Sequence, residues 1–356
     1  MDTNRSEKQQ NRNKNQPQKP KEQKEEKGDS EASEEGSGFE GYDFKKNSKI
    51  IVKKGFVNRY RALLGSKYDE FMKCNLSFLR RSFRINTLKA NTEAVKRVLS
   101  EIWDLEQIPW CKQGFWISSD KRRDIGNHIY HQLGMIYVQE AASMIPPVVL
   151  DPKPGDFVLD MAAAPGSKTT QIAAMMENKG VIIANEADYR RLKLLQMNLQ
   201  RCGVLNAMIT NYNGITFGAK KLKFDKILLD APCSGTGTIR KSFMTLKMWN
   251  EKMIEKLSRL QQKLIESAFS ALKDGGILVY STCSLEPFEN ERVVSNLIEN
   301  HKNARIEEIN LAIKRDKSIT CFNGEQYSKE VEKCLRIYPQ TNDTSGFFVC
   351  KIRKNP

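Results

Sequence analysis

The sequence predicts an α/β fold in which a mostly parallel, doubly wound sheet with an antiparallel C-terminal hairpin follows a small α+β module. Residues 157–170, FVLDMAAAPGSKTT, join a short apolar run to a Pro-Gly-Ser turn of the kind that opens a helix. From about residue 146, strand patterns alternate with helical patterns, as a doubly wound sheet requires. Near the C-terminus, two apolar runs flank the turn-rich TNDTSG, which is typical of a hairpin.

The composition limits the class of protein. A chain of 356 residues can bury a large core and hold two domains. It has no run of eighteen apolar residues and no signal-peptide core, so we expect a soluble, cytoplasmic protein that does not bind a membrane. The eight cysteines include no C-x-x-C pair, and there are three histidines. Neither a metal site nor a disulfide framework is therefore expected.

The net charge of +15 lies in the part of the chain that is predicted to fold. Residues 1–48 hold 10 basic and 11 acidic side chains, so the remaining 308 residues hold 48 and 32, net +16. A basic folded body favours RNA or DNA over an anionic membrane, because no basic amphipathic anchor is present. A basic protein without a polyanionic partner is the alternative that charge alone leaves open.

Residues 1–48 are predicted to be a disordered polar tail, because almost no apolar residue precedes Phe39 and burial cannot offset the ordering entropy. Residues 49–145 are predicted to form a small basic RNA-binding module. Helices are expected over 56–64, 68–74 and 92–102, and strands over 82–88 and 110–117.

Basic and aromatic side chains interleave in this module, a pattern that suits phosphate contact with base stacking. A strand aromatic that belongs to the core is the alternative. The residues concerned are Arg80, Arg81, Phe83, Arg84, Trp110, Phe115, Trp116, Lys121, Arg122 and Arg123.

Residues 146–356 are predicted to form the larger domain. Apolar residues at helical spacing predict helices over 189–201, with Gly203 as C-cap, over 250–272, ending at 274–276, and over 286–299. Parallel strands are expected over 157–159, 181–186, 207–210, 224–230 and 277–282, and the hairpin over 335–338 and 347–351.

The turn after the first parallel strand is predicted to bind a ligand. Small residues there let a ligand approach the backbone, and the next helix offers free N–H groups to an anion. The turn consists of Asp160, Ala162, Ala163, Ala164, Pro165, Gly166 and Ser167. The alternative is an ordinary buried strand followed by any helix.

The ligand is expected to be an adenosine without a pyrophosphate. The G-x-G-x-x-G fingerprint and the G-x-x-x-x-G-K-[ST] phosphate loop are both absent. The next strand ends at Glu186, whose carboxylate can accept hydrogen bonds from both ribose hydroxyls. These features describe S-adenosylmethionine. The alternative is that Glu186 is an ordinary charge at a strand end.

Two cysteines lie just beyond strand ends, Cys233 in DAPCSGTG and Cys283 in STCS. Such ends face the ligand crevice in this topology. A single free cysteine is more often a small buried hydrophobe, but two in equivalent places, one preceded by Asp230, favour a paired role.

A cytosine explains why a methyltransferase needs a thiol. A thiolate that adds to carbon 6 makes carbon 5 nucleophilic toward a methyl donor, and Asp230 is near enough in sequence to meet the resulting charge at N3. An ordinary cysteine is mostly protonated at neutral pH, so positive potential would help. A second thiol would assist when the thioether breaks.

These motifs together resemble the Nop/Sun family of RNA cytosine-5 methyltransferases, most of all its compact transfer-RNA members. The resemblance runs from about residue 80 to 351. It rests on FRINTLK, DMAAAPGSKTT, Glu186, DAPCSGTG, STCS followed by Glu289-Asn290-Glu291, and RIYP with a later GFF. It implies a Rossmann-like class I methyltransferase sheet over 146–356, S-adenosylmethionine as donor, and a small RNA-recognition-like N-terminal module.

The resemblance also implies residue roles. Cys283 is the attacking nucleophile, Cys233 promotes product release, Asp230 contacts the cytosine, and Lys168 is placed by the active site. Lys168, Asp230 and Arg191 are also expected in the cofactor site.

The sequence departs from the family pattern at two positions. Asn213 stands where an aspartate usually meets the adenine amino group, and an uncharged acceptor there predicts weaker cofactor affinity. Ser345 stands where aspartate is common before GFF.

The predicted function is methylation of carbon 5 of a cytosine, in transfer RNA first and ribosomal RNA second, through a covalent cysteine adduct at carbon 6. The target base must be single-stranded or flipped out. We expect a monomer without a metal ion. A DNA cytosine-5 methyltransferase would attack with the Pro-Cys thiol and would not need the second motif. An amino-group methyltransferase would need neither thiol, and a catalytically inactive RNA-binding protein would not need all three reactive residues.

Overall fold

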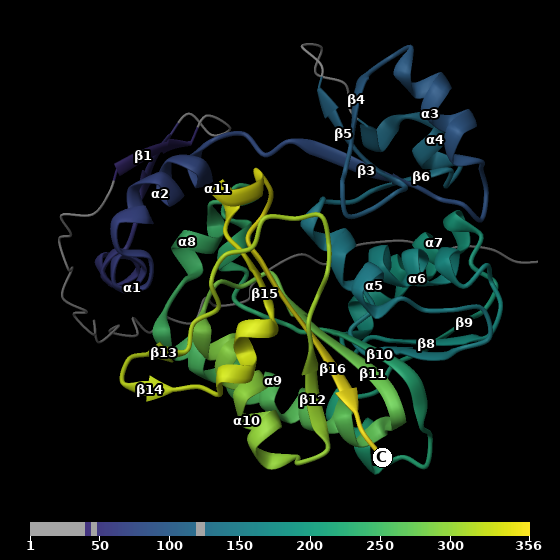
Figure 1. Ribbon diagram of the computed structural model, residues 1–356. Coiled ribbons are helices and arrows are strands. Elements are labelled where there is room, and N and C mark those ends of the chain that lie inside the picture. The colour runs from purple at the N-terminus through teal and green to yellow at the C-terminus, as the bar shows by residue number, and fades with distance from the viewer. Residues whose placement is uncertain (1–39, 44–47, 119–124) are drawn as a thin grey trace, which may run out of the picture. The chain divides into compact units, whose positions relative to one another are not determined.

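A computed structural model describes residues 40–43, 48–118 and 125–356, which all lie in one compact unit (Figure 1). The larger sheet contains parallel strands that alternate with helices, as expected. These elements are β7 (Phe157–Asp160), α6 (Ser167–Met175), β8 (Val181–Asn185), α7 (Tyr189–Cys202), β9 (Ala207–Thr210), β10 (Phe224–Asp230), α8 (Met244–Met248), α9 (Glu251–Ala271), β11 (Leu272–Thr282) and α10 (Glu291–Asn300).

The eight-stranded sheet has the order β12-β16-β11-β10-β7-β8-β9, with β15 also paired to β16. The five strands β7 to β11 run parallel to one another, whereas β16 pairs antiparallel with β11, β12 and β15. The chain places β10 on the opposite side of β7 from β8, so the strand order reverses between β7 and β10. The C-terminal elements are β12 (Ala304–Glu307), β13 (Cys321–Phe322), β14 (Glu325–Gln326), β15 (Leu335–Ile337), α11 (Pro339–Asn342) and β16 (Phe347–Lys354).

The sheet is covered on both faces because its strands are apolar on both sides. Leu228 and Val158 belong to one core cluster, together with residues of α5 (Ile145–Leu150) and α6. Their strand neighbours Leu229 and Leu159 belong to another cluster, together with residues of α9 and α10. Alternate side chains of a strand point to opposite faces, so each strand serves both cores.

The N-terminal module contains a four-stranded antiparallel sheet of order β4-β5-β3-β6. Its own core includes Phe83 and Phe115, which pack against Val95 and Leu99 of the α3 helix. The other elements are α3 (Thr92–Ser100), β3 (Arg81–Ile85), β4 (Asp104–Gln107), β5 (Gly114–Ser118), α4 (Ile129–Gln132) and β6 (Ile136–Val138).

The four aromatic residues that were predicted to stack on bases are buried, so that prediction is wrong for them. Phe83 and Phe115 are buried in the module core, while Trp110 and Trp116 pack into the cluster that contains α5 and α6. Trp110 Nε1 also donates to the carbonyl of Ala141.

The Arg84 side chain is also buried, so it cannot contact a phosphate. Its Nε donates to Gln139 Oε1 at 3.0 Å, and its Nη2 donates to Thr170 Oγ1 of α6 at 3.0 Å. Arg84 therefore joins the module to the larger sheet. The predicted basic cluster of Lys121, Arg122 and Arg123 lies outside the described residues.

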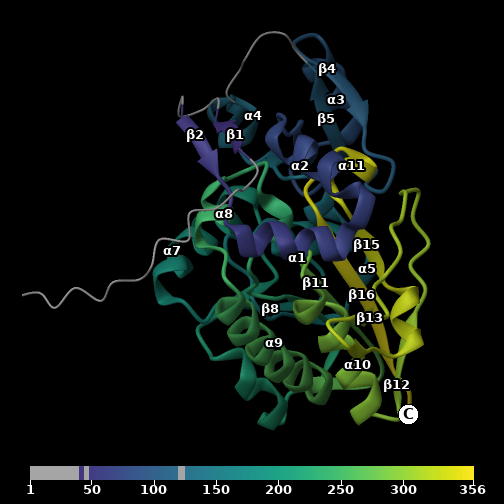
Figure 2. The ribbon, with the colours of Figure 1, turned by 90° about the vertical axis from the view of Figure 1, so that its left-hand side faces the viewer.

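Helices α1 (Lys54–Leu64) and α2 (Tyr68–Leu76) pack with the larger domain. Phe56 and Tyr60 belong to the core cluster of β10, α9 and α10, and Figure 2 shows α1 and α9 on the same face of the sheet. Arg59 is buried and its Nε donates to Glu286 Oε2 at 2.7 Å. The predicted module of residues 49–145 therefore contains two helices that complete the core of its neighbour.

Several boundaries differ from the expected ones. The Gly275-Gly276 pair was expected to follow a helix end, but α9 ends at Ala271 and β11 already begins at Leu272. A short 3-10 turn at Pro287–Glu289 delays α10 to Glu291. The hairpin is present, but β12 pairs with residues 351–354 of β16, beyond residues 347–349 that pair with β15, and this strand was not expected.

The predicted disordered tail does not hold for residues 40–43, which form β1 (Glu40–Asp43) and pair antiparallel with β2 (Ser48–Ile51). The rest of that segment before Ser48 lies outside the described residues. Across the described ranges, no helix has the length and apolar character needed to cross a membrane, and no group of three His, Cys, Asp or Glu side chains is placed to hold a metal ion.

Candidate active site

The predicted site residues line up along one edge of the sheet. The ends of β9, β8, β7, β10 and β11 lie side by side, because these strands are parallel neighbours in that order. They carry, in the same order, Asn213, Glu186, Asp160, Asp230 and Cys283. The strand order reverses between β7 and β10, and that reversal is where ligands bind in sheets of this kind.

The two predicted cysteines face each other. Cys233 follows β10 and Cys283 follows β11, and their Sγ atoms are 3.4 Å apart. Both residues are partly exposed. A hydrogen bond from Cys233 lowers the pKa of the Cys283 thiol, although burial and the Asp230 carboxylate act against it. The same contact, with burial, raises the pKa of the Cys233 thiol well above its usual value.

A buried cation and a carboxylate lie beside the thiols. Lys168 Nζ donates to Asp230 Oδ2 at 2.6 Å and to Ser143 Oγ at 3.0 Å, while Ser281 Oγ donates to Asp230 Oδ1 at 2.7 Å. Burial lowers the pKa of Lys168, but the Asp230 carboxylate outweighs it and the pKa is raised. Lys168 stays charged, and its charge also helps to lower the pKa of the Cys283 thiol.

A single carboxylate links the two cysteine loops, which we call the Cys233 loop (residues 231–243) and the Cys283 loop (residues 283–290). Glu289 is fully buried. It accepts the backbone N–H of Ser234 at 2.9 Å, and also the hydroxyls of Ser234 and Ser284 and the amide of Gln261. Burial raises the pKa of Glu289, and these donors act against that shift. The carboxylate fixes the residue that follows each cysteine.

Two glycines let the loops approach the C-terminal strand. The N–H of Gly237 donates to the carbonyl of Cys283 at 2.9 Å, and the N–H of Gly346 donates to the carbonyl of Gly237 at 2.8 Å. A Cβ on Gly237 would lie 2.2 Å from the carbonyl oxygen of Gly346, closer than any side chain can approach. Close approach of the backbones therefore explains why glycine stands in the GTG and GFF motifs.

The turn between β7 and α6 fits a close ligand. Gly166 has φ +105°, and a Cβ there would meet Leu195 at 3.1 Å. Ala162 and Ser167 are partly exposed, Pro165 is exposed, and Ala163 and Ala164 are buried. Asp160 is buried and accepts Thr169 Oγ1 at 2.6 Å, so it organises the turn from within; burial raises its pKa to about 7.

Glu186 lies next to this turn. Its carboxylate accepts the N–H of Ala164 at 3.2 Å and that of Asp188 at 2.9 Å, and it lies 3.3 Å from Arg191 Nη1. A carboxylate has about four acceptor positions, so it can still accept from a ribose. Arg191 also donates to the carbonyl of Ala164, so it orients both the acid and the turn.

The two departures from the family pattern have local roles. Asn213 is exposed, and its Oδ1 accepts the N–H of Ile215 at 3.1 Å, which caps the following helical turn. Ser345 is buried and its N–H donates to Glu140 Oε1 at 3.1 Å.

Three supporting residues were not predicted. Ser281 lies two positions before Cys283, and its place inside STCS was the available signal. Ser143 comes from the connection between the two sheets, where no pattern marks it. Glu289 was part of a quoted motif, but no role was assigned because its partners are far apart in the sequence.

The strand order, the reversal between β7 and β10, and the antiparallel β16 define a class I methyltransferase fold. Residues 147–353 match the family described as 16S rRNA methyltransferase RsmB/F, and residues 52–141 match the N-terminal domain of 16S rRNA methyltransferase RsmF. The chain therefore belongs to the RsmB/F family, also called Nop/Sun, and the resemblance found in the sequence is confirmed.

Relatives and solved structures agree with this family. The chain is 49% identical over 313 residues to tRNA (cytosine(49)-C(5))-methyltransferase of Pyrococcus abyssi, with 88% of this chain and 99% of the relative covered. It is 42% identical over 315 residues to Ribosomal RNA small subunit methyltransferase F of Vibrio atlanticus, with 86% of this chain but 65% of the relative covered. The chain thus spans about two thirds of that bacterial relative.

A methyltransferase homologue from Pyrococcus horikoshii aligns with a TM-score of 0.77 at 40% identity, covering 85% of this chain and 95% of that one. NSun6 from the same organism, solved with SFG, aligns with a TM-score of 0.74 at 26% identity, covering 85% and 98%.

Proposed function

We propose that this protein transfers a methyl group from S-adenosylmethionine to carbon 5 of a cytosine in transfer RNA, through a covalent adduct between Cys283 and carbon 6. The observation that carries the proposal is the pair of thiols 3.4 Å apart beside the Lys168–Asp230 ion pair, at the sheet reversal. A methyltransferase that acts on an amino group has no use for two facing thiols.

The residues at the strand ends fit the cofactor. Glu186 would hold the ribose hydroxyls, the turn of Ala162 to Ser167 would lie against the rest of the nucleoside, and Asn213 would meet the adenine. The relative solved with SFG, an analogue of S-adenosylmethionine, supports this choice. When bound, S-adenosylmethionine supplies the methyl group that carbon 5 accepts.

We assign Cys283 as the nucleophile because the family resemblance gives it that role, and the positive charges of Lys241 and Lys168 act to lower the pKa of its thiol. The thiolate adds to carbon 6 of the cytosine and makes a C–S bond, and the electron pair of the C5–C6 double bond moves so that carbon 5 becomes nucleophilic. The ring gains charge at N3. This charge is negative, so it needs a proton donor: in the Lys168–Asp230 pair, Lys168 supplies the proton and Asp230 is the group assigned to contact the cytosine. Hydrogen bonds with Ser281 and Ser143 hold the pair in place.

Cys233 assists the last step. Once carbon 5 carries the methyl group, its proton passes to a water molecule and the electron pair of the C5–H bond re-forms the C5–C6 double bond. The C–S bond breaks at the same time, and its electron pair returns to Cys283 as thiolate. The S–H group of Cys233 donates to that sulfur and stabilises it as a leaving group, because the contact that lowers the pKa of Cys283 also favours the departing thiolate.

Transfer RNA is the favoured substrate. The relative from Pyrococcus abyssi is named for transfer RNA and matches this chain over nearly its whole length. The bacterial relatives named for ribosomal RNA are longer, so ribosomal RNA is the second candidate.

The test is incubation with methyl-labelled S-adenosylmethionine and either total transfer RNA or ribosomal RNA, followed by nucleoside analysis. Label in 5-methylcytosine from the transfer-RNA pool is the expected result. Label from the ribosomal pool alone would select the second candidate. No label from either pool, with intact cofactor binding, would favour a catalytically inactive RNA-binding protein.

Replacing Cys233 with alanine is expected to trap the covalent intermediate. Attack by Cys283 still occurs, but the departing thiolate loses its hydrogen bond, so the enzyme–RNA adduct accumulates. The adduct is measured as a band on denaturing gels that resists heat and urea and disappears after nuclease digestion. The Cys233→Ala/Cys283→Ala double variant should give no band. Normal turnover by Cys233→Ala would contradict the release role.

Replacing Asn213 with aspartate is expected to strengthen cofactor binding about fivefold. A charged acceptor gains roughly 1 kcal/mol over a neutral one in a hydrogen bond to an amino group, and it still accepts the N–H of Ile215. Isothermal titration with S-adenosylhomocysteine measures the change. Asn213→Ala should weaken binding in the same experiment. Equal affinity of the wild type and both variants would show that Asn213 does not contact the cofactor.

A further inference from the structure

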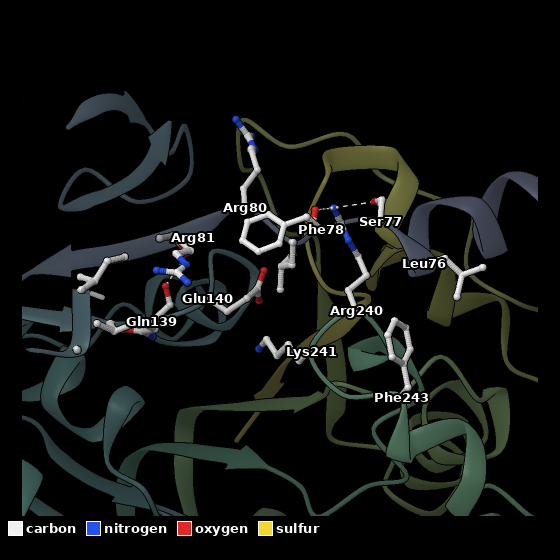
Figure 3. Close-up of a pocket in the computed structure, with 15 residues that line it drawn as sticks. Leu76, Ser77, Phe78, Arg80, Arg81, Gln139, Glu140, Arg240, Lys241 and Phe243 are labelled. Carbon is white, nitrogen blue, oxygen red and sulfur yellow. Dashed lines mark hydrogen bonds between the residues drawn. The ribbon is translucent and has the colours of Figure 1, made fainter. Parts of the chain in front are cut away.

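A pocket of about 690 Å³ opens beside the candidate active site (Figure 3). The connection from α2 to β3 forms one wall, and β6 and the Cys233 loop form the others. The pocket shares Val138, Gln139, Glu140 and Lys241 with a second cavity of about 380 Å³, which reaches Ser143. Ser143 accepts a hydrogen bond from Lys168, so the second cavity reaches a residue that contacts the Lys168–Asp230 pair.

Phe78 is the exposed aromatic residue at this pocket. Its side chain is 68% exposed, and Figure 3 shows its ring between the side chains of Arg80 and Arg240. Other phenylalanines of the module, such as Phe83 and Phe115, are buried. An exposed ring at a pocket edge has a free face on which a planar group can stack.

The backbone at Phe78 is held firmly although its ring is exposed. Arg240 is only 5% exposed, and it extends from the Cys233 loop to donate to the carbonyl of Phe78 and to Ser77 Oγ. An ion pair of 2.7 Å with Asp343 fixes the Arg240 guanidinium. The ring is thus attached to the loop that carries a reactive thiol, so it is held at a set place relative to that thiol.

The pocket also offers positive charge for a phosphate. Arg80, Arg81, Arg240 and Lys241 line it, with Glu140 as the acidic residue among the lining side chains. Arg80 and Arg240 are engaged with Asp343. Lys241 is exposed, and the described residues include no ion pair for it. It is near enough to the thiols that its charge acts on Cys283.

We propose that this pocket binds the nucleotide next to the target cytosine in single-stranded RNA, with its base stacked on Phe78 and its phosphate at Lys241. The proposal rests on the proposed function, because it takes the cytosine to lie at Cys283. A base that is flipped out leaves its neighbour unstacked, and an aromatic platform beside the site replaces the lost stack. Aromatic stacking combined with a cation is the chemistry that recognises single-stranded nucleic acid.

The experiment uses the full chain and short RNAs that contain a methylatable cytosine, with 2-aminopurine placed either 5′ or 3′ to it. Stacking on Phe78 is expected to quench the 2-aminopurine fluorescence in one of the two RNAs. Phe78→Ala should abolish that quenching and weaken RNA binding about 5- to 100-fold, the range for loss of one base–aromatic stack. Phe78→Trp should keep both.

Control variants separate stacking from charge and from folding. Leu205→Ala removes an apolar side chain that is 85% exposed and does not line the pocket, and it should bind RNA like the wild type. Lys241→Gln should reduce the slope of log affinity against log salt by about one, whereas Phe78→Ala should leave the slope unchanged. Cofactor affinity should be the same in all of them.

The outcomes distinguish the two proposals. If the wild type methylates the RNA but Phe78→Ala binds and quenches like the wild type, the nucleotide pocket is wrong. If Phe78→Leu retains full quenching and affinity, an apolar contact and not stacking is responsible, and the proposal fails. If the wild type does not methylate cytosine in any RNA, the proposed function is wrong, and the pocket proposal that rests on it is wrong as well.

Discussion

Replacing Cys283 with alanine is expected to reduce RNA methylation to below about one thousandth of the wild-type rate. Without the thiolate, carbon 5 of the cytosine stays a poor nucleophile. Cys233 should not substitute, because burial and the Glu289 and Asp230 carboxylates still raise the pKa of its thiol when Cys283 is gone. Single-turnover incorporation of labelled methyl groups measures the loss. Cofactor binding should be unchanged, because Glu186 and the turn before α6 do not contact this thiol.

A matched cysteine variant makes the test specific. Cys321 is exposed and lies in β13, apart from the site residues described above, so Cys321→Ala should retain full activity. Retained turnover in Cys283→Ala together with loss of turnover in Cys233→Ala would mean that the Pro-Cys thiol attacks. The order of the two roles would then be reversed.

Replacing Arg336 with methionine is expected to lower the free energy of unfolding by about 3–5 kcal/mol. Arg336 and Glu291 are both fully buried, and Nε of Arg336 donates to Glu291 Oε1 at 2.8 Å. Nη1 also donates to the carbonyl of Leu285 in the Cys283 loop. Removing the guanidinium leaves a buried carboxylate without its cation, which is the costly way to break such a pair. Urea denaturation followed by circular dichroism measures the effect.

Two comparisons identify the cause of that loss. The Arg336→Met/Glu291→Leu double variant removes both charges and should recover much of the stability, because no charge stays buried. Lys333→Met breaks the exposed ion pair with Glu330 and should change stability by about 0–1 kcal/mol. If Arg336→Met lowered the free energy of unfolding as little as Lys333→Met, burial would not determine how much the Arg336–Glu291 pair contributes to stability.

The reactive residues could be predicted from the sequence because parallel strands end at one edge of a sheet. Each strand pattern ended at a recognisable residue, so Glu186, Asp230, Cys233 and Cys283 could be placed near one another without long-range information. The alternation of strand and helix patterns likewise predicted the parallel sheet. The family resemblance supplied the roles of the two thiols, which spacing left open.

The supporting contacts could not be predicted, because they join residues far apart in the chain. Arg84 looked like a phosphate ligand, but its partners Gln139 and Thr170 enclose it. Trp110 and Trp116 looked like stacking residues, but they pack against α5 and α6. The exposure of Phe78 was not predicted. Its ring stays in solvent while Arg240, which is distant in the sequence, holds its backbone, and the neighbouring residues do not indicate this.

The ion pair between Arg59 and Glu286 limits where the N-terminal module of this enzyme can be exchanged. Glu286 lies in the Cys283 loop, and its Oε1 also accepts Trp249 Nε1, so α1 supplies a cation to a carboxylate three residues from Cys283. A graft that replaced everything before the large sheet would remove this cation. A chimaera that is joined after α2, near residue 80, keeps it, so the segment that can be replaced is shorter than the N-terminal region, and α1 belongs structurally with the larger domain.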